Sequence, residues 1–140
     1  MAKYKYKASN PRAGGLMTLS QYEAMLKNCL RGVHRTWSGA NQAKLASRDG
    51  SKVVNPATGR ECIAHICNVC GAKLMDKEVE IDHIESFVPL DSTWHDMINS
   101  MTFIEVCDRL FGEKDAYQVL CSGCHYGISQ AQNEFRRLSR

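Results

Sequence analysis

The sequence predicts an α+β fold in which a small pair of strands lies between helical segments. Apolar residues recur at helical spacing over residues 19–37 and again from Ile128 to the C-terminus. Residues 78–84 alternate like a half-buried strand, and residues 117–120 form a short apolar run. Two Cys-x-x-Cys pairs adjoin these strands, namely Cys67/Cys70 and Cys121/Cys124. At 140 residues the chain has the length of one domain.

Charge is unevenly distributed along the chain. Residues 1–60 contain 11 Lys and Arg against 2 Asp and Glu, whereas residues 61–116 contain 4 against 12. We expect residues 1–16 to be a flexible basic tail and residues 17–60 a basic helical extension. This pattern is typical of a protein whose basic ends bind phosphates and whose acidic centre attracts a divalent cation. Charged surfaces that are only solvated, with no binding partner, have the same composition. The candidate phosphate contacts are Lys27, Arg31, Arg35, Lys44 and Arg48.

Two helices are expected in the extension. Thr18 with Gln21 predicts a capping box that begins a helix of about residues 19–37. Asn41 is expected to cap a second, short helix that ends at Asp49-Gly50.

The elements after residue 60 are expected to bring the cysteine pairs together. A strand over 62–66 leads to the first pair, and the strand over 78–84 ends before Pro89. Helices follow at 92–99 and 103–111, the second with a Thr102/Glu105 capping box. The strand 117–120 leads to the second pair and to a final helix, whose expected buried stripe is Ile128, Ala131, Phe135 and Leu138.

The cysteines indicate a metal site. Seven cysteines without an apolar leader favour thiolate ligation in a reducing compartment over disulfides, so we expect a soluble, cytoplasmic protein with no membrane association. Two Cys-x-x-Cys turns can complete the tetrahedral shell of a structural zinc. Unconnected thiols or a redox pair are the alternatives. The expected zinc ligands are Cys67, Cys70, Cys121 and Cys124, which leaves Cys29, Cys62 and Cys107 as ordinary apolar residues.

Between and after these pairs lie residues suited to phosphodiester hydrolysis. The order Cys67-Asn-Val-Cys70, then Glu80-Ile-Asp-His-Ile84, then Gln118-Val-Leu-Cys-Ser-Gly-Cys-His125 resembles the HNH endonuclease family, most closely its small free-standing members encoded by bacteriophages. The resemblance covers roughly residues 60–138. It implies a ββα-metal core within a nuclease domain at 61–140, with DNA as substrate and, for a phage protein, the host cytoplasm as location. It further implies His83 as the general base, with Asp82 and His125 as ligands of a catalytic Mg²⁺ or Mn²⁺.

The chemistry of these residues agrees with that resemblance. A neutral His83 imidazole can take a proton from water near neutral pH, and a cation held by Asp82 can offset charge on the scissile phosphate. Because neighbouring strand residues point to opposite faces, Asp82 and His83 meet one phosphate only where the strand bends or ends. The sequence departs from the family at two places. Asp115-Ala116 stands at the usual position of the middle Asn, for which Asp115 is a candidate substitute and Asn133 a secondary one, and Ile128-Ser129 replaces a Lys-Thr pair.

Other interpretations remain open at this point. Asp82-His83 is also a common polar pair for a strand end, and His125 is an alternative zinc ligand in place of Cys124. A non-catalytic, zinc-stabilised DNA- or protein-binding module would need the same cysteines, and a thiol oxidoreductase is a third possibility. The oligomeric state is not determined by the sequence. The remaining histidines are expected to be surface or strand residues: His34, His65 and His95.

Overall fold

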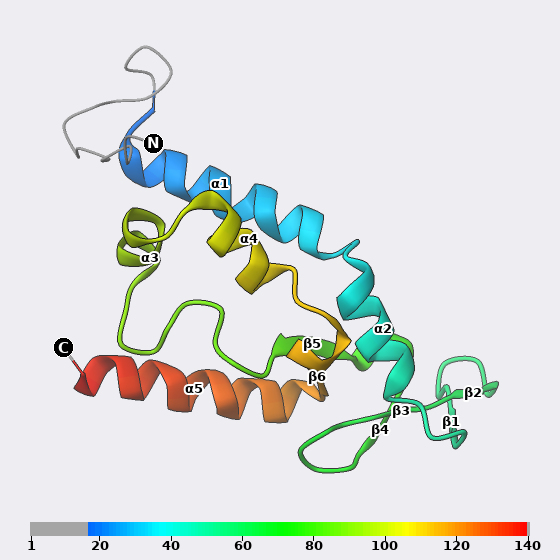
Figure 1. Cartoon of the computed structure of the whole chain (residues 1–140). Helices are drawn as coiled ribbons and strands as arrows, with labels where there is room; N and C mark the ends of the chain where they lie inside the picture. Colours follow the sequence, from blue (N-terminus) through cyan, green and yellow to red (C-terminus); the bar gives the residue numbers. More distant parts are fainter. Residues whose placement is uncertain (1–16, 140) are drawn as a thin grey trace.

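The computed structural model describes residues 17–139, so the predicted tail at 1–16 lies outside the described residues. Helices and short antiparallel strand pairs make up the fold, as expected for the α+β class. Figure 1 shows one strand pair, β5–β6, near the middle of the molecule, with α5 on one side and α1 and α4 on the other. Two further strand pairs project at the end near α2.

The two N-terminal helices are α1 (Leu19–His34) and α2 (Ser38–Ala46). The predicted capping box begins α1: Thr18 Oγ1 accepts from the Gln21 backbone N–H at 3.3 Å, and the Gln21 side chain accepts from the Thr18 N–H at 2.8 Å. The prediction that Asn41 caps the second helix is wrong, because α2 begins earlier, with Trp37 at its N-cap. The chain turns between the two helices over residues 35–37, so the first helix ends about one turn earlier than predicted.

Three antiparallel pairs contain all six strands of the described residues. They are β1 (Lys52–Val54) with β2 (Glu61–Ile63), β3 (His65–Ile66) with β4 (Lys73–Leu74), and β5 (Glu80–His83) with β6 (Tyr117–Leu120). The predicted strand 62–66 is therefore two strands that meet at the buried Ala64. The chain changes partner at Ala64: its N–H donates to the carbonyl of Ser51, the residue opposite it in the β1–β2 register, and the pairing with β4 begins at the next residue, His65.

Two helices connect β5 to β6, and each begins at a capping box. Thr93 caps α3 (Trp94–Ser100) with Asp96 at the third helical position, and Thr102 caps α4 (Phe103–Leu110) with Glu105, as predicted. Both helices lie against α1 (Figure 1). The side chain of His95 on α3 contacts Glu23 on α1, with Nδ1 2.9 Å from Oε1.

The last helix, α5 (Ser122–Leu138), packs against β5 and β6. Its predicted buried stripe is right only at Ile128, because Ala131, Phe135 and Leu138 are exposed. The partly buried positions after Ile128 are Ser129, Gln132 and Arg136. Arg136 reaches the loop after β5, where its Nη2 donates to Ser86 Oγ at 2.8 Å and to the Val88 carbonyl at 3.0 Å.

The β5–β6 pair separates two apolar clusters. Ile81 and Tyr117 pack with Ala40 and Ala43 of α2 on one face, whereas Leu120 packs with Cys67 and Leu74, and with Ile128 of α5, on the other. Since Ile81 pairs with Val119 and Asp82 with Gln118, alternation puts His83 on the α2 face and Asp82 on the α5 face.

The boundary predicted near residue 60 stays a prediction. The β1–β2 pair lies on both sides of that residue, and α2 packs against β6. Among residues 17–139, none of the helices is both long enough and apolar enough to cross a membrane.

Candidate functional site

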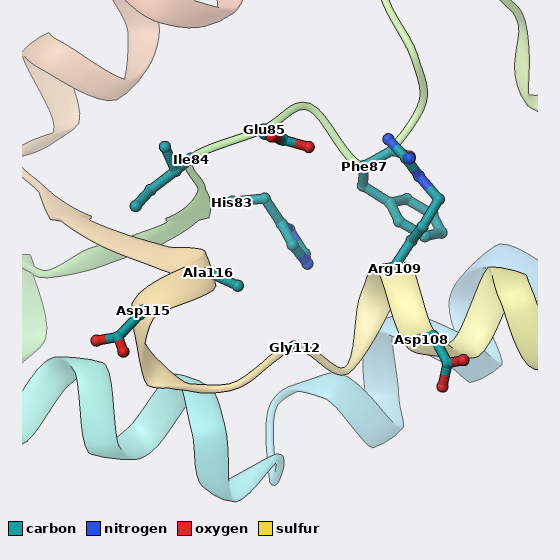
Figure 2. Close-up of a pocket in the computed structure, with 9 residues that line it drawn as sticks. All are labelled: His83, Ile84, Glu85, Phe87, Asp108, Arg109, Gly112, Asp115 and Ala116. Atoms are coloured by element: carbon teal, nitrogen blue, oxygen red, sulfur yellow. The ribbon is translucent and has the colours of Figure 1, made fainter.

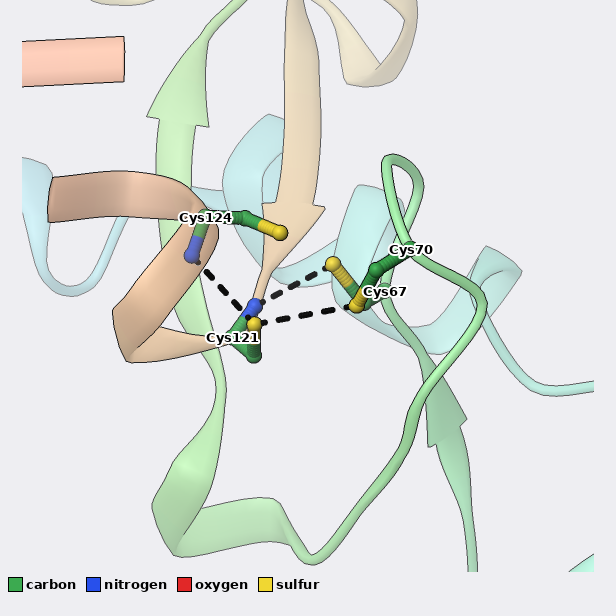
Figure 3. A group of neighbouring side chains, drawn as sticks. All are labelled: Cys67, Cys70, Cys121 and Cys124. Carbon is green, nitrogen blue, oxygen red and sulfur yellow. Dashed lines mark hydrogen bonds between the residues drawn. The ribbon is translucent and has the colours of Figure 1, made fainter. Parts of the chain in front are cut away.

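The four predicted ligand cysteines lie together, as the sequence predicted. Their sulfur atoms are all within 4.8 Å of one another, a grouping that could hold a metal ion such as zinc. Figure 3 shows Cys67 and Cys70 on the loop after β3, facing Cys121 and Cys124 at the start of α5. In the described part of the chain this is the one group of three or more Cys, His, Asp or Glu side chains within such a distance. His125 is not a member, so all four positions are supplied without it.

Local backbone structure explains why each pair folds this way. Gly71 follows the first pair with φ of 74°, a value that side chains larger than glycine rarely adopt, and its N–H donates to the Cys67 carbonyl at 2.9 Å. Cys121 is the N-cap of α5, and its sulfur accepts the Cys124 N–H at 3.4 Å. The Cys121 N–H in turn donates to Cys67 Sγ at 3.3 Å, which joins the two halves of the cluster (Figure 3).

Asn68 fastens the first pair to the strand that leads to the second. Its N–H donates to the Val119 carbonyl at 2.8 Å, and its Oδ1 accepts the Val119 N–H at 2.6 Å. Sequence reasoning did not identify Asn68, although an amide inside a Cys-x-x-Cys turn is a signal that could have found it. These two hydrogen bonds hold the sulfur atoms of Cys67 and Cys121 near each other.

The cysteine cluster favours a negative charge on one sulfur. Burial opposes ionisation of Cys67, but N–H donors from Cys70, Cys121 and Val69 outweigh it and lower the pKa of Cys67 to about 6. The pKa of Cys124 is raised to about 12, first by its hydrogen bond with the Cys121 thiol. Protons are therefore shared among the thiols, and a thiophilic cation would displace them on binding.

His65 lies in β3, two residues before Cys67, and its side chain contacts the end of α2. It is a strand residue, one of the two alternatives expected, and it is fully buried. Its Nδ1 lies 2.9 Å from the Lys44 carbonyl and 3.0 Å from Ser47 Oγ, and its Nε2 lies 3.3 Å from Asp76 Oδ1. Asp76 also pairs with the Lys44 ammonium at 2.9 Å. This pairing is the largest of the causes that lower the pKa of Asp76. Lys44 thus has a structural role in addition to its predicted contact with phosphate.

His83 lies at the end of β5 among aromatic rings. Its ring centroid is 4.8 Å from that of Tyr117, 5.3 Å from that of His34 and 5.8 Å from that of Phe87. Its Nε2 is 3.0 Å from the carbonyl oxygen of Leu110, the last residue of α4. Because a carbonyl can only accept, Nε2 carries the proton, and Nδ1 of the neutral ring has a free lone pair.

A pocket of about 440 Å³ opens beside His83. Figure 2 shows the His83 ring directed into it between the Arg109 and Ala116 sides, whereas the Asp115 carboxylate points away from the ring. Asp115, the candidate substitute for the middle Asn, therefore does not point towards His83. The charged residues that line the pocket are Glu85, Asp108, Arg109 and Asp115.

The other two predicted catalytic residues lie outside the lining of this pocket. Asp82 is half-buried on the α5 face of β5, and its Oδ1 accepts the His83 N–H at 2.9 Å. His125 is half-buried one turn before Ile128, which packs towards the strands. Asp82 and His125 thus lie on the side of β5–β6 that α5 covers, and His83 lies on the opposite side. His83 is the last residue of β5.

The predicted phosphate contacts lie along α1 and α2. Lys27 is half-buried, with its ammonium 5.2 Å from the centre of the Trp94 ring. Arg31, Arg35 and Arg48 are exposed.

Comparison with models of protein families, with curated proteins and with solved structures finds no match.

Proposed function

We propose that the protein is a metal-dependent DNA endonuclease of the HNH type, in which His83 is the general base. The hydrogen bond from His83 Nε2 to the Leu110 carbonyl is the observation that carries the proposal. It leaves Nδ1 as a proton acceptor beside an open pocket, which is what a base needs in order to take a proton from water. The order β5, β6, α5 and the cysteine cluster at the start of α5 also support the proposed ββα-metal core.

In this proposal a zinc ion bound by the four cysteines holds the core together. Cys67, Cys70, Cys121 and Cys124 supply four sulfur ligands, as closed structural zinc sites require. The zinc has no part in the chemistry, because such a shell leaves no position for water.

A second, catalytic Mg²⁺ or Mn²⁺ would be held by Asp82 and His125. Both residues lie on the side of β5–β6 that α5 covers, outside the lining of the His83 pocket. A divalent ion bound there would offset the charge that develops on the phosphate.

DNA is the proposed substrate, held by the basic helices. Arg31, Arg35 and Arg48 present exposed guanidinium groups that can contact phosphates on any sequence. Lys27 and Lys44 are further candidates, although the first lies over the Trp94 ring and the second pairs with Asp76.

Nicking of supercoiled plasmid tests the proposal. Wild-type protein should cut with Mg²⁺ or Mn²⁺ and not with EDTA, and His83→Ala should lower the rate by about 10²–10⁴-fold, the usual contribution of a general base. Asp82→Ala and His125→Ala should be partly rescued by more divalent ion, unlike His83→Ala. His95→Ala is the matched control, because His95 is exposed, contacts Glu23 of α1 and does not line the pocket. A His83→Ala protein that cuts like the wild type excludes this mechanism.

One observation favours a second candidate, a non-catalytic zinc-stabilised module that binds DNA or protein. Asp82 and His83 lie on opposite faces of β5, so a single phosphate reaches both only at the strand end. Wild-type protein that contains zinc and binds DNA, yet cuts with none of the divalent ions, would support this module over the nuclease.

A further inference from the structure

We propose that Tyr117 is the positioning residue for His83 and acts through the carbonyl of Leu110. This inference rests on the proposed role of His83 as a base. Tyr117 Oη donates to the Leu110 carbonyl oxygen at 2.7 Å, and His83 Nε2 donates to the same oxygen at 3.0 Å. The two side chains come from paired residues of β5 and β6, and their rings are 4.8 Å apart.

The position of Leu110 in its helix makes this carbonyl available. Leu110 is the last residue of α4, and the final carbonyls of a helix have no partner within the helix. A carbonyl oxygen has two lone pairs, and here one accepts from His83 and the other from Tyr117. The oxygen is therefore held between two donors, and its direction sets which His83 nitrogen carries the proton.

Tyr117 is suited to donate in this way. Its side chain is buried, and burial is the first cause that raises the pKa of its phenol, so the hydroxyl keeps its proton over the range in which a histidine base works. Because the phenol packs against the His83 ring and also reaches the carbonyl beyond it, it limits both the tilt and the rotation of that ring.

The loop after Leu110 is held at a second point. Trp37 Nε1, at the start of α2, donates to the carbonyl of Gly112 at 2.7 Å. A side chain at Gly112 would not fit, since a Cβ there would lie 2.6 Å from the Cβ of Ala116. Thus β6 and the α1–α2 junction hold the segment that presents the Leu110 oxygen. Asp115, at the expected place of the middle Asn, points away from His83 (Figure 2), and Tyr117 does the positioning instead.

The first test is the tautomer of His83 in the wild-type protein. Nitrogen NMR of the imidazole at pH 8 should show the proton on Nε2 and an unprotonated Nδ1. A ring protonated on Nδ1 overturns the inference, and this measurement requires neither activity nor a variant.

The second test is Tyr117→Phe, which keeps the ring and removes only the hydroxyl. We expect the His83 signals to shift towards a mixture of tautomers and kcat to fall by about 10–100-fold with KM little changed, similar to the loss of a partner that orients a metal-bound histidine. Tyr126→Phe is the matched control, because Tyr126 is 66% exposed on α5. Wild-type tautomer and rate in a folded Tyr117→Phe protein overturn the inference. A wild type that never cuts but shows the Tyr117-dependent tautomer overturns only the nuclease proposal.

Discussion

At the scale of single residues, His34 shows how burial can set the protonation of a histidine. Its ring stacks on that of His83 at 5.3 Å, and among the described residues its Nε2 has no hydrogen-bond partner. Burial first, and the neighbouring His83 second, lower the pKa of His34 below its ordinary value. The folded protein therefore resists protonation at a site that is readily protonated in the unfolded chain.

This difference predicts a loss of stability in mild acid. Between the lowered pKa of folded His34 and the ordinary value of about 6.5, the unfolded chain binds more protons than the folded one. The free energy of unfolding should therefore be fully retained above about pH 6.5 and fall as the pH drops below it. In His34→Gln the fall between pH 7 and pH 5 should be shallower, as measured by urea unfolding at each pH. His95→Gln, at an exposed position, is the control. Equal slopes in wild type and His34→Gln would contradict the prediction.

The sequence predicted which cysteines lie together, but it did not predict which residues His83 and His65 contact. Cysteine spacing predicted the four-sulfur cluster, because the turn geometry is local to each pair. The contact of His83 with Leu110 could not be predicted, since it joins a strand to the end of a helix 27 residues away. Burial of His65 was also missed, because its partners Lys44 and Ser47 belong to a helix that the sequence does not place beside it.

At the scale of elements, strong local signals were predicted well. The capping boxes at Thr18 and Thr102 mark the helix starts correctly, and the β6 prediction matches residues 117–120. Strands β1 and β4 have only three and two residues and were missed, since so few residues show no clear alternation. In the second half of α5 the apolar spacing predicted the wrong buried face. There the side that faces the protein carries Arg136, which donates to the Val88 carbonyl.

The contact of Arg136 with the loop after β5 predicts that Arg136 and its neighbour Arg137 contribute differently to stability. Arg136 donates to the Val88 carbonyl of this loop, and Arg109 holds the same loop by donating to the carbonyls of Ser86 and Phe87 at 3.0 and 3.1 Å. Arg136→Ala should lower the free energy of unfolding by about 2 kcal/mol, because it leaves the partly buried Val88 carbonyl and Ser86 hydroxyl without their charged donor. Arg137→Ala is the matched control, since Arg137 is exposed and pairs only locally with Glu134. Urea unfolding of both variants measures the effect, and equal losses would contradict a specific role of Arg136.

At the scale of the whole molecule, charge is arranged so that basic helices lie beside an acidic pocket. If α1 holds DNA, changing Arg31 and Arg35 to Ala should weaken binding on all sequences alike. The dependence of log affinity on log salt should become shallower by roughly 0.9 for each phosphate that the variant no longer neutralises. Arg60→Ala, on the exposed turn between β1 and β2, removes one positive charge away from α1 and is the control for each of the two single changes. Fluorescence anisotropy over a salt series measures this, and an unchanged slope would mean that these side chains are only solvated.

The cysteine cluster joins distant parts of the chain. Between Cys70 and Cys121 lie β4, β5, α3, α4 and β6, so a metal bound there would close a loop that contains the central β5–β6 pair and both helices that connect its strands. The apolar clusters on either side of β5–β6 are small, with three buried residues each. In zinc-finger peptides, binding of a structural zinc contributes about 10–16 kcal/mol to folding, which is more than such clusters supply.

We therefore predict one zinc per chain by elemental analysis, and unfolding when a strong chelator removes it. Cys121→Ser is the most informative variant, because serine is itself a preferred N-cap and can begin α5, so that the change removes a metal ligand and little else. Its melting temperature should fall by more than about 10 °C, the scale expected when several kcal/mol are lost from a domain of this size. Cys29→Ser, at an exposed position of α1 outside the cluster, should melt like the wild type. A fully folded protein without zinc, or a Cys121→Ser variant as stable as the Cys29→Ser control, would show that the four sulfur atoms lie together for a reason other than metal binding.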